Sequence, residues 1–219
     1  MTDRASFRDA VAARPLVCAE VVGPLPVGKS EWRGYARRTM QARPQAARWA
    51  HEIRAAGELL AIAQAHNALT VALYSPIGAE VGTRELANLL LAHGHKLAYP
   101  RLRDDGVQLD FCLCDGPAAL VKRPRSRLLE PFGVPCDPHS IDLMVLPALA
   151  LNAGLARLGQ GGGSYDRYVP GLAPTCIRVG LVGSACLVPW SPVSAHDAVL
   201  DAVCSDDGLF GPNTATLGS

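Results

Sequence analysis

The sequence predicts an α/β protein with a doubly wound, mostly parallel sheet and helices on both faces, a Rossmann-like three-layer sandwich. The segments "IDLMVLP" (141–147) and "CIRVGLV" (176–182) are apolar at nearly every position, as in parallel strands that helices cover on both sides. Strand-like runs also alternate with segments of helical periodicity, which favours a parallel sheet over a meander. At 219 residues and 49% hydrophobic content, the chain can bury a substantial core.

Three helices are expected before the first strong strand. The first covers residues 30–42, and Pro44 suits the first turn of the second. The third covers residues 83–94, with Thr83 as N-cap and Gly94 after its last turn. The second helix carries an apolar stripe at three- and four-residue spacing, which predicts its buried face: Trp49, Ile53, Ala56, Leu60 and Ala63.

Three shorter strands complete the predicted sheet, over residues 70–76, 96–100 and 107–113. We expect one domain over residues 29–206. Residues 1–28 read as a proline-containing leader of uncertain order, and residues 207–219 as a flexible tail. The sequence shows no internal repeat.

Composition argues against several classes of partner. The formal net charge is +1 and the pI about 7.6, so no global field attracts nucleic acid or an anionic membrane. Seven scattered cysteines without a C-x-x-C pair suit free thiols in a reducing compartment. The first 22 residues lack the long apolar core of a secretory signal. We therefore expect a cytoplasmic protein, a monomer or weak homodimer.

Two loops are expected to form a ligand site. Residues 75–82 and 152–166 each follow a predicted strand. In open α/β sheets, ligands bind where the carboxyl ends of strands meet their loops. The two loops are far apart in the sequence but can therefore meet in one cleft.

The segment "ARLGQGGGSYDRY" (156–168) is the strongest candidate for gripping phosphate. Its glycines allow close approach of a ligand to the backbone: Gly159, Gly161, Gly162 and Gly163. Arg157 and Arg167 flank them, and a guanidinium binds phosphate through two parallel hydrogen bonds. A helix that begins near Ser164 would add amide donors, and Asp166 is a natural magnesium ligand. The alternative is a glycine-rich turn with exposed charges.

A second candidate lies near the start of the first helix. Lys29 and Arg33 are four residues apart, so on a helix they share a face and can bracket one anion. The stretch "GPLPVGKS" (23–30) also fits the P-loop pattern. Pro24 and Pro26, however, lack the N–H groups with which a P-loop holds phosphate.

Taken together, residues 29–206 resemble the 5-formyltetrahydrofolate cyclo-ligase family, also called 5,10-methenyltetrahydrofolate synthetases. The most specific match is "RLGQGGGSYDR". The other landmarks follow in the family's order: the Lys-x-x-x-Arg pair, "ALYSPIGAEVGT", "LAYPRL", "LLEPFG", "IDLMVLPALAL" and "DAVLDAV".

The resemblance implies an enzyme that uses ATP and Mg²⁺ to convert 5-formyltetrahydrofolate to 5,10-methenyltetrahydrofolate. The formyl oxygen would be phosphorylated, the folate N10 would attack, and phosphate would leave. The roles it implies are these: Lys29, Arg157 and Tyr165 catalytic; Lys29, Arg33, Arg157, Arg167 and the four glycines ATP-binding; Ser75, Glu80 and Tyr165 folate-binding; Asp166 and Asp197 magnesium ligands. Without the resemblance, Glu80 and Asp197 would be interpreted as surface acids.

Four positions depart from the family's pattern. Leu151 and Asn152 stand where it usually has Phe-Asp, Ser164 replaces a tyrosine, and Gly82 replaces an acid. The phosphate and metal positions match, whereas parts of the expected folate pocket differ. Two alternatives therefore stay open: a family member that binds nucleotide without folate turnover, and a P-loop protein. The six histidines lack metal-ligand spacing and are interpreted as structural.

Overall fold

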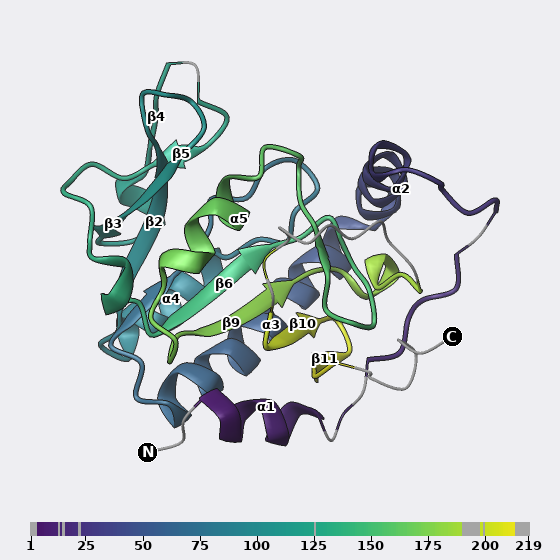
Figure 1. Ribbon diagram of the computed structural model, residues 1–219, viewed down its shortest axis with the longest axis horizontal. Helices are drawn as coiled ribbons and strands as arrows, with labels where there is room; N and C mark the ends of the chain where they lie inside the picture. Colours follow the sequence, from purple (N-terminus) through teal and green to yellow (C-terminus); the bar gives the residue numbers. More distant parts are fainter. Residues whose placement is uncertain are drawn as a thin grey trace.

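The computed structural model describes residues 4–12, 14, 16–21, 23–124, 126–189, 198 and 200–212 (Figure 1). Its centre is a seven-stranded sheet. The strands in spatial order are β11 (Gly208–Phe210), β10 (Ala202–Ser205), β9 (Ile177–Leu181), β6 (Leu143–Pro147), β1 (Thr70–Ala72), β2 (Lys96–Leu102) and β3 (Leu109–Cys114).

The five inner strands run parallel, and an antiparallel strand closes each edge. β6 is buried at all five positions and β9 at four of five, because helices or loops cover both faces of the sheet. The register pairs Val71 of β1 with Leu143 of β6, and Val145 of β6 with Val179 of β9. The predicted mostly parallel α/β sheet is confirmed.

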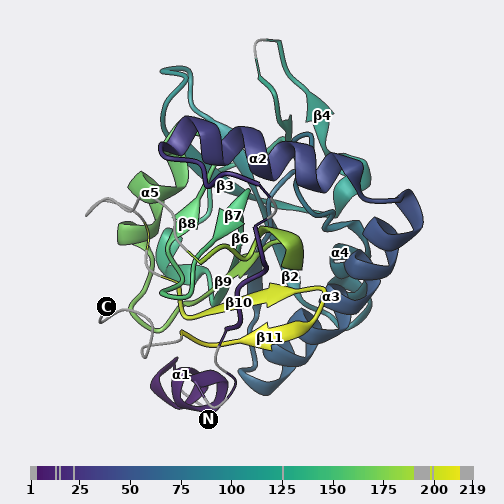
Figure 2. The same cartoon turned by 90° about the vertical axis from the view of Figure 1, so that its right-hand side faces the viewer.

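Helices form the outer layers (Figure 2). α3 (Gln45–Ala65) and α4 (Arg84–Ala92) lie on one side of the sheet, and α5 (Ser164–Tyr168) lies on the other. α2 (Lys29–Ala42) crosses above the sheet and buries Trp32, Ala36 and Met40, one residue per turn. Four short 3₁₀ helices complete the helical elements: η1 (Pro117–Ala119), η2 (Pro138–Ser140), η3 (Val169–Gly171) and η4 (Ser184–Cys186).

The buried face of α3 differs from the predicted stripe. Trp49 and Ile53 are 61% and 45% exposed, so the prediction was wrong for this half of the helix. The buried face is rotated from the predicted stripe: it keeps Ala56 and Ala63 and adds His51, Ala55, Leu59 and Ile62. The predicted stripe and the observed buried face both have helical spacing. The observed face is set by how α3 packs on the core and against α4.

The start of α4 is capped from another helix. Thr83 occupies the N-cap position as predicted, but its hydroxyl donates to the Tyr74 carbonyl at 3.0 Å. The Glu52 carboxylate of α3 instead accepts the amides of Arg84 and Glu85 at 2.9 and 3.2 Å. Gly94, with φ of +82°, follows the last turn as predicted.

Both ends of the described chain pack onto the sheet edge. α1 (Arg4–Ala12) lies within the expected leader, and Arg4 and Arg8 both bind the buried Asp201 carboxylate. β11 lies within the expected tail and pairs with β10. Residues 4–12 and 208–210, which lie outside the expected domain limits of 29 and 206, thus pack against the sheet.

Two small hairpins accompany the sheet: the β4–β5 hairpin stands at the top of Figure 1, and β7 and β8 are labelled in Figure 2. β4 (Val121–Lys122) pairs with β5 (Leu129–Glu130), and β7 (Ala150–Leu151) pairs with β8 (Arg157–Leu158). Among the described residues, no helix combines the length and the apolar character needed to span a membrane. All seven cysteines are free thiols, as expected.

Candidate active site

The candidate site lies where β1 and β6 end side by side. From this pair the chain continues to β2 on one side of the sheet and to β9 on the other, which makes it the topological switch point of the fold. The two loops that follow these strands line a single cleft of about 570 Å³. The expected meeting of residues 75–82 with residues 152–166 is thus confirmed.

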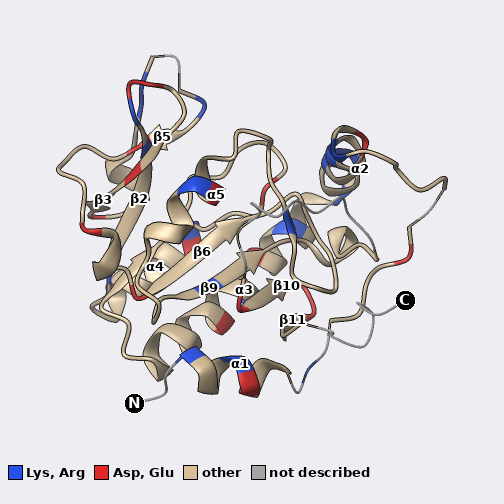
Figure 3. Ribbon diagram, in the orientation of Figure 1, with Lys and Arg blue, Asp and Glu red and all other residues tan. Residues whose placement is uncertain are grey.

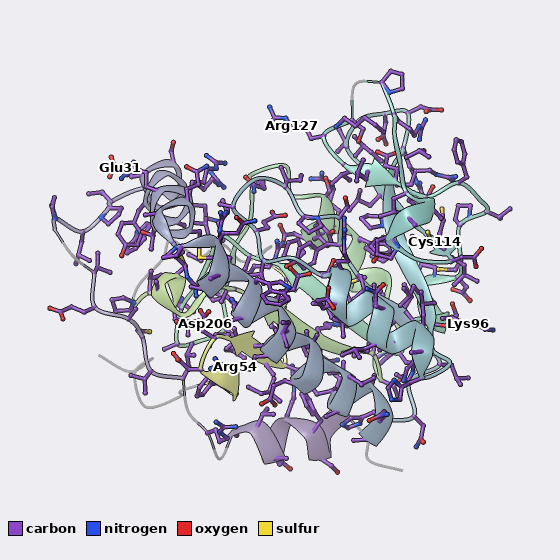
Figure 4. The ribbon with its side chains drawn as sticks, turned by 180° about the vertical axis from the view of Figure 1, so that it is seen from behind. Glu31, Arg54, Lys96, Cys114, Arg127 and Asp206 are labelled. Carbon is purple, nitrogen blue, oxygen red and sulfur yellow. The ribbon has the colours of Figure 1, made fainter. Side chains whose placement is uncertain are left out.

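The cleft has walls from four parts of the chain. In Figure 4, Glu31 marks the first turn of α2 and Arg127 marks the β4–β5 hairpin, which stand on opposite sides of it. The floor is the glycine loop, residues 159–163, and the remaining wall is the loop after β1. Figure 3 shows basic residues on α2, on α5 and on the hairpin, all toward this edge of the sheet.

Arg157 is the central cation of the site. It is the first residue of β8, just before the glycine loop, and it is only 7% exposed. Its Nη1 donates to the Pro147 carbonyl at 3.1 Å and its Nη2 to Asp166 Oδ1 at 2.5 Å. The guanidinium also lies 5.6 Å from the centre of the Tyr165 ring, a cation–π contact.

The glycines leave room for guanidinium groups. A Cβ at Gly159 would lie 2.7 Å from Arg157 Nη1, and one at Gly161 would lie 3.3 Å from Arg33 Cζ. Gly161 and Gly163 have φ of +108° and +65°, values that other residues adopt only with strain. Gly163 ends the loop as the N-cap residue of α5. The loop is therefore a shaped turn that brings backbone and cations together, as the sequence predicts.

Lys29 and Arg33 lie on α2 and both line the cleft. Arg33 Nε donates to the Gly159 carbonyl at 2.9 Å, which ties α2 to the glycine loop. The P-loop alternative is not borne out. In residues 16–21 and 23–28, the described part of that stretch, the backbone forms no strand, and a P-loop requires a strand before its glycines.

Glu80, Ser75 and Tyr165 also line the cleft. Glu80 Oε2 accepts the Ile77 amide at 2.8 Å, and Oε1 accepts from Gln160 at 3.0 Å. Burial raises the pKa of the Glu80 carboxyl, although these two bonds oppose the shift. Burial also raises the pKa of Tyr165, and the nearby Glu80 adds to the effect. The Ser75 hydroxyl accepts the Leu129 amide at 3.2 Å and so holds the hairpin.

One of the predicted site residues, Arg167, is not brought into the cleft. Arg167 is exposed and does not line it; its Nη2 donates to the carbonyls of Gly162 and Val107 at 2.7 and 2.9 Å. It therefore holds the loop from outside. Asp197 lies outside the described residues.

Three of the four departing positions also lie away from the cleft. Asn152 Oδ1 accepts the amides of Gly154 and Ala156 at 3.0 and 2.9 Å and shapes the β7–β8 turn. Leu151 is fully buried beside Gly180. Gly82 leaves space for the Glu52 carboxylate, which lies 2.2–2.8 Å from where a Cβ would stand. Only Ser164 is among the residues that line the cleft.

Sequence reasoning missed several residues of the cleft. Gln160 joins Glu80 to Arg37 by hydrogen bonds at 3.0 and 2.8 Å. Ser126, Arg127 and Leu128 enter from the β4–β5 hairpin, and the apolar side chains of Leu102 and Leu109 come from β2 and β3. The residue types in the hairpin form no recognisable sequence motif, because these residues reach the cleft only through the way the hairpin folds.

Residues 29–206 match the 5-formyltetrahydrofolate cyclo-ligase family. The chain belongs to that family. This membership confirms the resemblance and the prediction of an enzyme of the cyclo-ligase class. The chain is also similar to a protein named 5-formyltetrahydrofolate cyclo-ligase from Mycolicibacterium smegmatis, at 30% identity over 143 residues. That match covers 61% of this chain and 72% of the relative.

Two solved structures share the fold. A 5,10-methenyltetrahydrofolate synthetase from Mycoplasma pneumoniae has a TM-score of 0.67 at 21% identity, covering 81% of this chain and 98% of that one. A 5,10-methenyltetrahydrofolate synthetase from Aquifex aeolicus has a TM-score of 0.67 at 23% identity, covering 84% and 92%. At this level of identity the likeness supports the α/β fold, and the site must be argued from this chain's own residues.

Proposed function

We propose that this protein converts 5-formyltetrahydrofolate to 5,10-methenyltetrahydrofolate, with ATP converted to ADP and phosphate and Mg²⁺ as the cofactor. The observation that carries the proposal is the composition of the cleft. Lys29, Arg33 and Arg157 line it around a glycine loop, and the Glu80 carboxylate and Tyr165 line it as well; we assign the first group to a nucleotide end and the second to a substrate end. A cationic end and an acceptor-bearing, partly apolar end in one cleft suit the joint binding of a polyphosphate and a pterin.

The nucleotide end would bind the ATP phosphates. Lys29 stands in the first turn of α2, where the helix dipole adds to its positive charge. Arg157 is buried and held in place from two sides, so its guanidinium loses little entropy on binding phosphate. The backbone N–H groups of residues 159–163 supply further donors. We assign to Arg167 the support of this loop in place of a phosphate contact.

The residues present fit a magnesium ion that arrives with the nucleotide. Asp166 lines the cleft, and its Oδ1 accepts from Arg157 and from the Ala198 amide, which leaves Oδ2 as the oxygen we assign to a cation. Among the described residues, no cluster of three or more ligating side chains could hold a metal alone. That suits Mg²⁺, which usually keeps waters and binds through one or two carboxylates plus substrate phosphates. When bound, Mg²⁺ would neutralise phosphate charge.

The substrate end would hold the folate. An ionised carboxylate accepts two N–H groups of a flat heterocycle in one plane, and we assign this role to Glu80. Tyr165 offers a ring face beside it, and Phe111 supports that ring at 6.2 Å between centroids. Leu102, Leu109 and Leu128 add apolar wall. The family's tyrosine at position 164 is replaced by the smaller Ser164, so this wall is more open here.

The reaction asks for positioning more than for a protein nucleophile. Phosphoryl transfer to the formyl oxygen breaks the bond to the ATP β-phosphate oxygen and leaves ADP. Attack of N10 on the activated formyl carbon then closes the ring and expels phosphate. Arg157 and Lys29 would stabilise the charge on the transferring group, and Tyr165 would exclude water from the formyl carbon. No Ser-His or Cys-His pair is needed.

The test is turnover by the purified protein with a carboxamide variant beside it. Product is expected only when 5-formyltetrahydrofolate, ATP and Mg²⁺ are all present. Asp166→Asn should abolish the Mg²⁺-dependent turnover while the thermal melt stays cooperative. Binding of ATP without any methenyl product would instead support the alternative of a nucleotide-binding family member without folate turnover. An active Asp166→Asn variant would contradict the metal role.

We also propose that the protein acts in the cytoplasm as a monomer or weak homodimer. Seven unpaired thiols support a reducing compartment. We expect the same activity with and without a reducing agent. We also expect a monomer mass by light scattering.

A further inference from the structure

Gln160 connects the glycine loop to the loop after β1 and to α2. It is half-buried and stands between Gly159 and Gly161, in the middle of the segment proposed to hold phosphate. Its amide N–H donates to Glu80 Oε1 at 3.0 Å, on the loop after β1. Its amide oxygen accepts from Arg37 Nη2 at 2.8 Å, on α2. One side chain therefore connects three separate elements of the site.

The chemistry of the partners defines the orientation of this amide. A guanidinium can only donate, and an ionised carboxylate can only accept. Gln160 must therefore turn its oxygen to Arg37 and its nitrogen to Glu80. A glutamate at position 160 could still accept from Arg37 but could not donate to Glu80, and a leucine could do neither.

The same helix holds the loop at two successive points. Arg33 Nε binds the Gly159 carbonyl at 2.9 Å, and one turn further along α2 Arg37 binds the Gln160 side chain. Glu80 is held at its other oxygen by the Ile77 amide at 2.8 Å. The position of Glu80 thus depends on the position of the glycine loop, through Gln160.

We propose that Gln160 is a positioning residue that couples the two ligands: a nucleotide on the glycine loop holds Gln160, and Gln160 holds Glu80 in the orientation that binds the folate. This inference rests on the proposed function. The ligand that binds first orders the loop and bears the entropic cost. The second ligand then binds more tightly, so the two sites are positively coupled. By linkage, the folate must tighten nucleotide binding by the same factor.

Calorimetry can measure this coupling without turnover. The probes are 5-formyltetrahydrofolate and a non-hydrolysable ATP analogue with Mg²⁺, each titrated in the absence and presence of the other. For the wild type we expect the analogue to tighten folate binding by about tenfold, within the usual range for coupled sites. For Gln160→Leu we expect the folate affinities with and without the analogue to agree within about twofold. The affinities for the analogue with and without folate should agree equally well.

Gln108→Leu is the matched control. Gln108 also accepts a hydrogen bond from an arginine, Arg103 Nη1 at 2.9 Å, but its side chain is exposed and does not line the cleft. This variant should keep the wild-type ratio. Arg37→Met should reduce the ratio but not abolish it, because it leaves the bond between Gln160 and Glu80 intact. If Gln160→Leu fails to fold, Gln160→Glu carries the test and should also lose the coupling.

The outcomes are distinguishable. A Gln160→Leu or Gln160→Glu protein that keeps the wild-type ratio overturns the inference and leaves the proposed function standing. If the wild type turns over folate but binds it equally well with and without the analogue, the inference is also overturned and the proposed function stands. A wild type that binds the analogue but no folate overturns the proposed function, and the inference with it.

Discussion

Replacing Arg157 with methionine tests the assignment of the phosphate end most severely. Methionine keeps the length of the side chain but removes the guanidinium. Three contacts are lost: the bond to the Pro147 carbonyl at 3.1 Å, the bond to Asp166 at 2.5 Å and the contact with the Tyr165 ring at 5.6 Å. The Asp166 carboxylate then loses its buried partner.

The magnitude follows from the burial of the pair. Removing one partner of a buried ion pair costs about 3–5 kcal/mol. The side chain of Asp166 is 22% exposed, so water can partly replace the guanidinium, and we expect a loss of about 3 kcal/mol in the free energy of unfolding. Loss of one charged donor at the reacting group lowers kcat by about 10²- to 10³-fold.

The assay separates the two effects. Urea unfolding gives the change in stability, and kcat and KM for ATP are measured at a temperature where the variant is fully folded. Arg103→Met is the control, since Arg103 is an exposed arginine that pairs with Asp110 away from the cleft, and its turnover should match the wild type. An Arg157→Met protein within about tenfold of wild-type kcat would refute the role of Arg157 at the transferring phosphate.

Three further predictions concern pH, core packing and the N-terminal helix. Because burial raises the pKa of Glu80 above its ordinary value of 4.5, kcat/KM should fall as pH drops through that raised pKa, and Glu80→Gln should remove this acid limb from the profile; an unchanged limb in the variant would assign it to another group. Gly180→Ala should cost about 1–3 kcal/mol by urea unfolding, since its Cβ would lie 2.7 Å from Leu200 and 2.9 Å from Leu151 side-chain atoms; unchanged stability would mean that the strand can shift. Asp201→Asn should cost about 2–4 kcal/mol and raise hydrogen exchange in α1, because the carboxylate holds both Arg4 and Arg8; an equally protected α1 would show that other contacts hold it.

The sheet could be predicted from the sequence because its strands carry their own signal. β6 and β9 are apolar on both faces, and this pattern occurs only where both faces are covered. The meeting of the two loops also followed from sequence, since the carboxyl ends of neighbouring parallel strands share one edge. The orientation of α3 could not be predicted. Its buried face is rotated from the predicted stripe and shares only Ala56 and Ala63 with it, because the packing of the helix on the sheet and against α4 sets that face.

Other features depend on contacts between distant residues. β11 has a weak sequence of its own and forms because β10 offers an edge. Glu52 caps α4 from α3, which explains why Gly82 can replace the usual acid, and no local pattern shows this. Gln160 is the only residue other than glycine in the segment 159–163, and its role follows from its two partners in space, Glu80 and Arg37. The charged and glycine residues that line the cleft could be chosen as candidates from the sequence, because phosphate binding favours those residue types.

The central claim is that one cleft joins nucleotide chemistry to folate chemistry. The most direct test is the ratio of ADP to 5,10-methenyltetrahydrofolate, both measured in the same reaction with limiting 5-formyltetrahydrofolate. We predict one ADP for each methenyl product, and no ADP when the folate is omitted. ADP formed without the methenyl product, or the same rate of ADP formation with and without folate, would contradict the claim.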